Sequence, residues 1–157
     1  MLFPEQNIYK YARLTAREKY TTDEAAFALH IGESSLRAYE AGQRPVPDDV
    51  AADMVILYDN LGLAQAHLKN KGRVAEMVLP DIDDKSLIQT SVELFTLMQE
   101  FQRKDSLPRL LAIAADDVIE ESERPEFDEI VDQMRNIIKK GLGLQRFCSA
   151  REEFGGL

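Results

Sequence analysis

The chain has 157 residues, of which 45 % are hydrophobic and 30 % charged, and its formal net charge at pH 7 is −9. This length fits one domain or a small head with a helical annex, and the aliphatic content is too high for a disordered chain. The negative charge argues against broad adhesion to nucleic acid or anionic lipid, so we expect any DNA contact to be local.

Targeting and membrane signals are not evident in the sequence. The N-terminus MLFPEQN lacks the basic and apolar blocks of a signal peptide, and the longest purely apolar run covers only residues 110–115. We therefore predict a cytoplasmic protein that does not associate with membranes. The single cysteine, Cys148, cannot form an internal disulfide and has no nearby histidine, so we interpret it as a passive thiol.

The pattern of the whole chain predicts an all-α protein. No stretch alternates apolar and polar residues for long, and no Asn-Gly or Asp-Gly hairpin turn occurs. Asn7 can cap a first helix that runs to about Lys19. Thr21 and Glu24 form a capping box, because the hydroxyl accepts from an amide of the first turn while the carboxylate reaches back to the cap amide. A second helix is predicted to begin there.

Two short helices joined by a tight turn are expected over residues 21–41. The second helix turns Ala25, Ala26 and Leu29 inward and ends at residues 30–32, and the third helix, residues 33–41, buries Leu36 and Tyr39. This is the helix-turn-helix pattern, in which a small residue lets the two axes approach closely.

The next segments continue the helical pattern. Gly42 can adopt the left-handed conformation that closes the third helix. Pro45 and Pro47 bracket a stiff turn, after which a fourth helix begins at Asp48.

Residues 21–44 resemble, without a gap, the helix-turn-helix of Xre/Cro-type (lambda-repressor-like) transcriptional regulators, which are common in bacterial phages and mobile elements. The positions that carry this resemblance are Thr21, Glu24, Ala26, Leu29, Ile31, Ser34, Leu36, Glu40, Gly42 and Arg44. The resemblance implies a five-helix DNA-binding head over residues 1–70. It also implies that Glu40 pairs within the head and does not face DNA.

Four features depart from that family. His30 stands where glycine is usual, although histidine is among the residues best tolerated at positive φ. Gly32 replaces a serine or threonine cap, and the spacing from Arg13 to Thr21 is about two residues longer than usual. Acidic side chains also outnumber basic ones in residues 1–68, whereas a typical DNA-binding head is neutral or basic.

The resemblance places a weakly basic DNA-binding surface on the third helix and its flanks. Glu33 can accept from cytosine N4 in the major groove, and Arg37 can donate to guanine or to a phosphate. Backbone amides at the start of the second helix can hold a phosphate without any side-chain charge. The predicted DNA-binding residues are Thr22, Glu33, Ser34, Ser35, Arg37, Ala38, Gln43 and Arg44.

The second half of the chain is expected to fold separately. Residues 71–84, which end in the acidic stretch LPDIDD, are predicted to connect the head to a helical domain at residues 85–141. In that domain a helix starts at Ser86, another starts at Ser106 and Pro108, and a last one runs from Pro125 to Gly141. Residues 142–157 are expected to form a disordered tail without an assigned role.

Two interpretations of residues 85–141 remain open, and both can hold. The domain can be a three-helix core without chemistry, or part of its surplus apolar surface can be a dimer interface. The first predicted helix has more apolar positions than a single stripe needs. A dimer would supply the symmetry that a palindromic operator requires.

Enzymatic interpretations have little support in the sequence. His30 and His67 stand alone, and no metal-ligand spacing, phosphate loop or dinucleotide glycine pattern is present. The acidic stretch DDVIEESE, residues 116–123, lacks the alternate ligands and central glycine of a calcium loop, so we interpret it as a solvated turn. We predict no catalytic, cofactor-binding or metal-ligating residue, and no enzyme.

The sequence therefore predicts a sequence-specific DNA-binding transcriptional regulator, with repression as the expected mode, that binds double-stranded DNA at a palindromic site as a homodimer. Because few basic groups face the DNA, the salt dependence should be shallow and the affinity of one head low. The alternative is a protein-interaction module, antirepressor-like or antitoxin-like, that uses the same fold to bind a protein partner.

Overall fold

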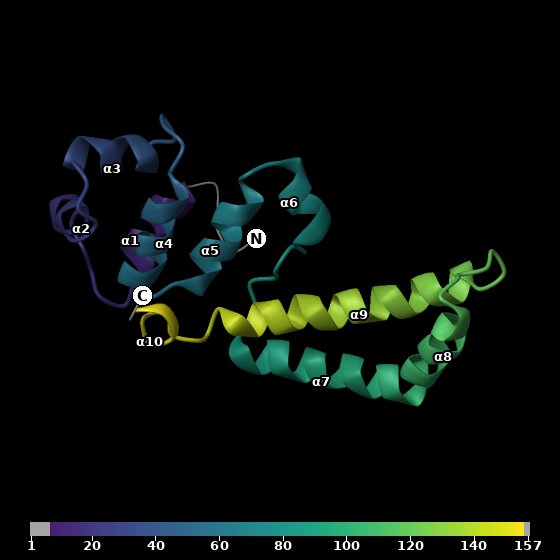
Figure 1. Cartoon of the computed structure of the whole chain (residues 1–157). Helices are drawn as coiled ribbons and strands as arrows, with labels where there is room; N and C mark the ends of the chain where they lie inside the picture. The colour runs from purple at the N-terminus through teal and green to yellow at the C-terminus, as the bar shows by residue number, and fades with distance from the viewer. Residues whose placement is uncertain (1–6, 156–157) are drawn as a thin grey trace. The chain divides into compact units, whose positions relative to one another are not determined.

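The computed structural model describes residues 7–155, and within that range the chain is all-α, with ten α-helices, one short 3₁₀ turn and no strand (Figure 1). The helices are α1 Ile8–Thr15, α2 Thr22–Ala28, α3 Glu33–Glu40, α4 Asp48–Leu57, α5 Leu61–Lys69, α6 Arg73–Val78, α7 Leu87–Arg103, α8 Ser106–Ile113, α9 Arg124–Gln145 and α10 Ala150–Phe154; the 3₁₀ turn η1 is Ala114–Asp116. None of the described helices is long and apolar enough to cross a membrane.

The chain forms two compact units. The first, here called the head unit, contains the described residues through Leu79 together with those from Gln145 onward, and the second, the hairpin unit, is Pro80–Leu144. The sequence predicted a contiguous head at residues 1–70, a connecting segment and a separate tail. In the structure the last residues of the chain instead belong to the same unit as the first.

The head unit is built around one apolar cluster supplied by α1 to α5. Leu36, Met54 and Leu63 have no exposed surface, and the small residues Ala12 and Ala25 allow close helix approach. Burying a side chain of that size stabilises the fold by about 1.5–3 kcal/mol each. The predicted cap of α1 is confirmed, because Asn7 accepts from two amides of the first turn.

The first helix is shorter than predicted. It ends at Thr15 instead of near Lys19, because the backbone of Ala16 turns out of the helical region at ψ 146°. Lys19 Nζ then donates to the Leu14 carbonyl oxygen over 2.9 Å and satisfies one acceptor at the helix end.

Two predicted left-handed positions are confirmed. His30 has φ 54° and Gly42 has φ 70°, each directly behind a short helix. Histidine tolerates this region at some cost, and glycine has no Cβ to clash there. These two residues therefore end α2 and α3 where the sequence pattern indicates.

The hairpin unit contains α7, α8 and α9, and Figure 1 shows α7 and α9 running side by side with α8 at one end. Helices α7 and α9 run antiparallel. A Cβ added to Gly143, near the end of α9, would lie 3.5 Å from Thr90 near the start of α7. At the opposite end Lys104 Nζ lies 2.9 Å from Glu129 Oε1. Among the described residues of this unit, only Ile113 and Ile130 are fully buried large apolar side chains.

The start of α7 matches the sequence prediction and the end of α9 does not. Ser86 caps α7 in a capping box with Gln89. The prediction that Gly141 ends the last helix is wrong, since α9 continues to Gln145. A glycine inside a helix costs only about 1 kcal/mol, which neighbouring turns and the close packing of Gly143 against Thr90 and Ile82 offset.

The predicted disordered tail is also wrong over its described part. Residues 142–145 belong to α9, and α10 packs against α4 within the head unit. Ala150 is completely buried, and Arg151 donates to the carbonyl oxygens of Ile56 and Leu57 at the end of α4. The Asp59 amide also donates to the Ile56 carbonyl oxygen. Carbonyl oxygens in the last turn of a helix have few amide partners, so the arginine adds donors that stabilise the end of α4.

Candidate nucleic-acid interface

The candidate interface begins with α2, which starts at Thr21 because that residue caps it. Thr21 accepts from the Glu24 amide, and Glu24 Oε2 accepts from the Thr21 amide over 2.8 Å, as the capping box predicts. These hydrogen bonds to Thr21 lower the pKa of Glu24, and a hydrogen bond from Thr21 lowers the pKa of Asp23. Both carboxylates therefore stay ionised and interact favourably with the positive, N-terminal end of the helix dipole.

A tight turn then leads into α3. The Ile31 amide donates to the Ala26 carbonyl oxygen over 3.0 Å and closes α2, and Gly32 begins α3 without a side-chain cap. Ala25, Ala26 and Leu29 on α2 face Leu36 on α3, all buried. The buried face of α3 is thus fixed, and its opposite face is left outside.

A buried ion pair holds α3 from behind. Arg13 Nε lies 2.7 Å from Glu40 Oε1 and Arg13 Nη2 lies 2.8 Å from Glu40 Oε2, with both side chains 7 % exposed. Arg13 Nη1 also donates to the Tyr20 carbonyl oxygen. The hydrogen bond with Glu40 raises the pKa of Arg13, so the guanidinium stays charged. The expectation that Glu40 pairs within the head is confirmed, and Arg13 on α1 is its partner.

A second contact fixes the same, C-terminal end of α3. Asn7 Nδ2 donates to the Tyr39 carbonyl oxygen over 2.9 Å, while Asn7 also caps α1. One side chain therefore ties the start of α1 to the last turn of α3. Because α1 holds α3 at two points, the outward residues of α3 are presented from a rigid support.

The structure leaves most of the sequence-predicted contact residues accessible. Glu33, Ser34 and Arg37 are exposed on α3, and Gln43 and Arg44 are exposed directly after it. Thr22, Ser35 and Ala38 are partly buried. A surface with one arginine, one carboxylate and a hydroxyl on its central helix can make hydrogen bonds to base edges, but it provides little attraction to phosphates.

Arg37 is the central positive group of this face, and it is not free. Its Nε donates to Glu33 Oε1 over 3.1 Å in an exposed pair one helical turn apart. Its charge also contributes to the lowered pKa of Asp23 on α2, which places a second carboxylate in its neighbourhood. The sequence singled out Glu33 and Arg37 separately, and the structure joins them.

Arg44 has a different local partner. Its guanidinium lies 5.8 Å from the centre of the Tyr39 ring, which is a cation–π distance. This contact holds the arginine near the end of α3 without neutralising its charge. Gln43 and Arg44 therefore extend the face of α3 beyond the helix itself.

Sequence reasoning missed how the C-terminus supports this unit. Arg151 on α10 reaches Glu18 over 2.9 Å and the Tyr20 hydroxyl over 3.0 Å, in the segment between α1 and α2. Ser149 Oγ donates to Asp59 Oδ1 over 3.0 Å. No local pattern indicates these contacts, because they join residues at least 90 positions apart.

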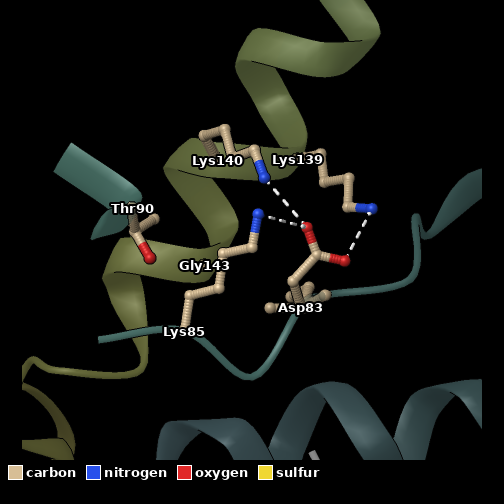
Figure 2. A pocket seen from close by; sticks show the side chains of 7 residues that line it. Asp83, Lys85, Thr90, Lys139, Lys140 and Gly143 are labelled. Carbon is tan, nitrogen blue, oxygen red and sulfur yellow. Dashed lines mark hydrogen bonds and ion pairs between the residues drawn. The ribbon is translucent and has the colours of Figure 1, made fainter. Parts of the chain in front are cut away.

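The hairpin unit has a separate charge cluster, shown in Figure 2. Asp83 accepts from Lys139 and Lys140 at 3.0 and 2.9 Å, with Lys85 at 3.9 Å, in a small hollow also lined by Ile82, Thr90 and Gly143. Hydrogen bonds from Lys140 and Lys139 lower the pKa of Asp83 to about 2.

The charges of this cluster are paired with one another within the hairpin unit. Glu93 pairs with Lys140 over 2.6 Å and with Lys85, so the lysines are matched by carboxylates of the same unit. These side chains line the hollow. The acidic end of the predicted connecting segment, residues 79–84, is therefore fixed against α9 at Asp83.

A row of hydrogen-bonded side chains in the head unit joins the buried Tyr9 and His67 to the exposed Asp48. Tyr9 Oη lies 2.7 Å from His67 Nδ1, and His67 Nε2 lies 2.8 Å from Asp48 Oδ1, with Lys71 also paired to Asp48. Burial, and then the Asp48 charge, raises the pKa of the Tyr9 hydroxyl, which keeps it protonated. This row links α1, α4 and α5. Over residues 7–155 no group of three or more His, Cys, Asp or Glu side chains could hold a metal ion.

Comparison with known proteins does not assign this geometry to a family. No protein-family model, no curated protein and no solved structure matches the chain. The function is therefore argued from the geometry of the head unit itself.

Proposed function

We propose that this chain is a sequence-specific DNA-binding transcriptional regulator that uses a helix-turn-helix in a lambda-repressor-like head. The observation that carries the proposal is the two-sided character of α3. Its inner side is fixed by Leu36 and by the Arg13–Glu40 pair, and its outer side presents Glu33, Ser34 and Arg37. A rigidly held helix with an exposed polar face suits insertion into the major groove.

The electrostatics of the head define the mode of binding. Because Glu33 and Asp23 offset the charge of Arg37, one head releases few counterions and binds weakly. Binding then requires two heads on a two-part site with half-sites about one helical turn apart. In this proposal the acidic chain disfavours indiscriminate DNA binding and leaves one face able to read sequence.

The direct test is selection of duplexes from a random double-stranded pool at low and at near-physiological salt. The proposal expects enrichment of an inverted repeat and a log–log salt slope shallower than about −6, at about −0.9 per neutralised phosphate. No enriched sequence at either salt would overturn it.

A matched pair of variants tests the contact face on the selected duplex. Arg37→Ala should weaken binding about tenfold or more, because it removes a donor to a base or phosphate. Arg135→Ala is the control, since Arg135 is exposed and paired with Asp132 on α9, and the substitution makes the same charge change. Equal binding by the two variants would remove Arg37 from the interface.

A second candidate function follows from one observation on α2 and one on α3. Phe27 on α2 is 84 % exposed, and the pairing of Arg37 with Glu33 on α3 makes the arginine less available to a phosphate. These features favour a protein-interaction module, antirepressor-like or antitoxin-like, in which α2 and α3 bind a protein. Failure of the duplex selection would make this candidate the leading one.

A further inference from the structure

The outward face of α7 carries almost no charge over most of its length. From Ser86 to Gln99 the helix has one ionisable residue, Glu93, and its carboxylate is engaged by Lys85 and Lys140. In a chain with 30 % charged residues, a helix that faces water over four turns is expected to carry several charges.

Large apolar side chains take the place of those charges. The exposed fractions of these side chains range from 53 % to 69 %. They are Leu87, Ile88, Val92, Phe95 and Met98. Ile88, Val92 and Phe95 are spaced by four and three residues and are followed by Gln99 and Gln102 at the same spacing, which forms one continuous seam along the helix.

The hairpin unit does not bury enough apolar surface by itself. Within its described residues only Ile113 and Ile130 are large apolar side chains with full burial, although the unit spans Pro80–Leu144. A unit of this size is marginal even with a well-formed core. The α7 seam therefore represents surface that the unit needs to cover in order to be stable.

Charge indicates what covers the seam. The hairpin unit has fifteen acidic and eight basic residues, so two copies repel each other through most of their surfaces. On the uncharged seam this repulsion is small. A basic protein would be drawn to the acidic surface instead, a nucleic acid would be repelled by that surface, and an anionic membrane requires basic residues beside the apolar stripe. Interface cores are depleted in charged residues in this same manner.

We propose that the α7 seam, Ile88 to Gln102, is a self-association surface that pairs two copies of this chain about a twofold axis. The same side chains then meet in both copies, as a twofold interface requires. The inference deepens the proposed function, since it identifies the surface that brings two DNA-reading heads together, and it rests on the two-headed mode stated there.

The test measures the mass of the full chain in solution by sedimentation at several concentrations, for the native protein and two variants. Phe95→Glu places a charge in the centre of the seam and should raise the dissociation constant at least a hundredfold. Met77→Glu is the matched control, because Met77 on α6 is also an exposed apolar side chain but belongs to the head unit. Its mass distribution should equal that of the native protein.

Circular dichroism of Phe95→Glu should show native helicity, because the side chain is 63 % exposed and its replacement disturbs no core. A second variant, Val92→Glu, should dissociate the protein in the same way. A native protein that stays monomeric throughout, or a Phe95→Glu variant that associates as the native protein does, would overturn the proposal.

The outcomes for DNA and for association are separable. If the native protein associates through the seam but selects no duplex, the seam stands and the DNA-binding proposal fails. If the native protein is monomeric but enriches single half-sites, DNA binding stands and the seam is overturned.

Discussion

The head unit and the hairpin unit are built from similar amphipathic helices, yet they cover their apolar surface to different extents. In the head unit, α1 to α5 surround one continuous cluster that includes Leu36, Met54 and Leu63. In the hairpin unit most large apolar side chains remain at least partly exposed.

The difference lies in how many neighbours each helix has. Five short helices and α10 meet in the head unit, whereas α7 has partners on one side only within the hairpin unit. Short helices arranged around a common centre can bury nearly every apolar side chain, while a long two-helix hairpin leaves one face of each helix open. The head unit is thus a self-sufficient fold, and the hairpin unit is suited to association.

The largest expected effect concerns the buried ion pair of the head. Arg13→Ala leaves the Glu40 carboxyl group buried without its partner, which should lower the free energy of unfolding by about 3–5 kcal/mol. Arg135→Ala removes an exposed pair of the hairpin unit and should change the free energy of unfolding by less than about 0.5 kcal/mol. Urea unfolding measures the free energy for both variants, and hydrogen exchange of α1 and α3 reports the loss in the head unit. Similar losses for the two variants would mean that solvent reaches the head pair.

The next effect tests the row of hydrogen-bonded side chains in the head unit. Tyr9→Phe leaves the buried His67 Nδ1 without its partner and should cost about 1–3 kcal/mol. Tyr58→Phe is the control, because the Tyr58 hydroxyl is also buried but makes no hydrogen bond within the described residues. The control should be neutral or slightly stabilising by thermal unfolding. A neutral Tyr9→Phe would show that the hydroxyl adds nothing to the fold.

A smaller effect is expected in the hairpin unit at low pH. The folded pKa of Asp83, about 2, lies below its ordinary value of 3.8. Its contribution is therefore complete above pH 4 and is lost as the pH falls toward 2. Because the side chain is 38 % exposed, solvent screening reduces this contribution to about 1 kcal/mol.

Hydrogen exchange of the end of α9 across this pH range should follow that loss. Asp83→Asn should be less stable than the native protein above pH 4 and should show a weaker dependence below it. Asp132→Asn, which alters an exposed pair on the same helix, provides the control. Identical pH profiles for native protein and Asp83→Asn would assign the acid sensitivity to other carboxylates.

The smallest effect is a stabilisation. Gly141→Ala lies inside α9, where an added Cβ meets nothing within 4 Å, and should raise the local free energy of opening by about 0.5–1 kcal/mol. Gly72→Ala in the head unit should do the opposite, because Gly72 has φ 124°, a region that alanine rarely adopts. Hydrogen exchange resolves the two sites. A destabilised Gly141→Ala would argue against a continuous α9.

Local chemistry made much of the fold readable from sequence. Asn7, Thr21 and Ser86 cap helices α1, α2 and α7, because their side-chain oxygens accept hydrogen bonds from first-turn amides that have no partner within the helix. His30 and Gly42 adopt the left-handed conformation that a helix end needs. The all-α class and the buried face of α3 follow from periodicity within one or two turns, so neighbouring residues suffice to define them.

Tertiary structure decided what depends on residues far apart. It gave Glu40 its partner Arg13, which lies 27 positions earlier in the chain. Helix α9 continues past Gly141 to Gln145, and α10 belongs to the head unit, where Arg151 donates to the Ile56 carbonyl oxygen. These features depend on packing and on the free energy of burying charges and carbonyl groups at distant positions. A local sequence pattern shows where a helix is favoured. It does not identify the partner of a charged side chain when that partner lies far away in the sequence, because the two meet only in the folded chain.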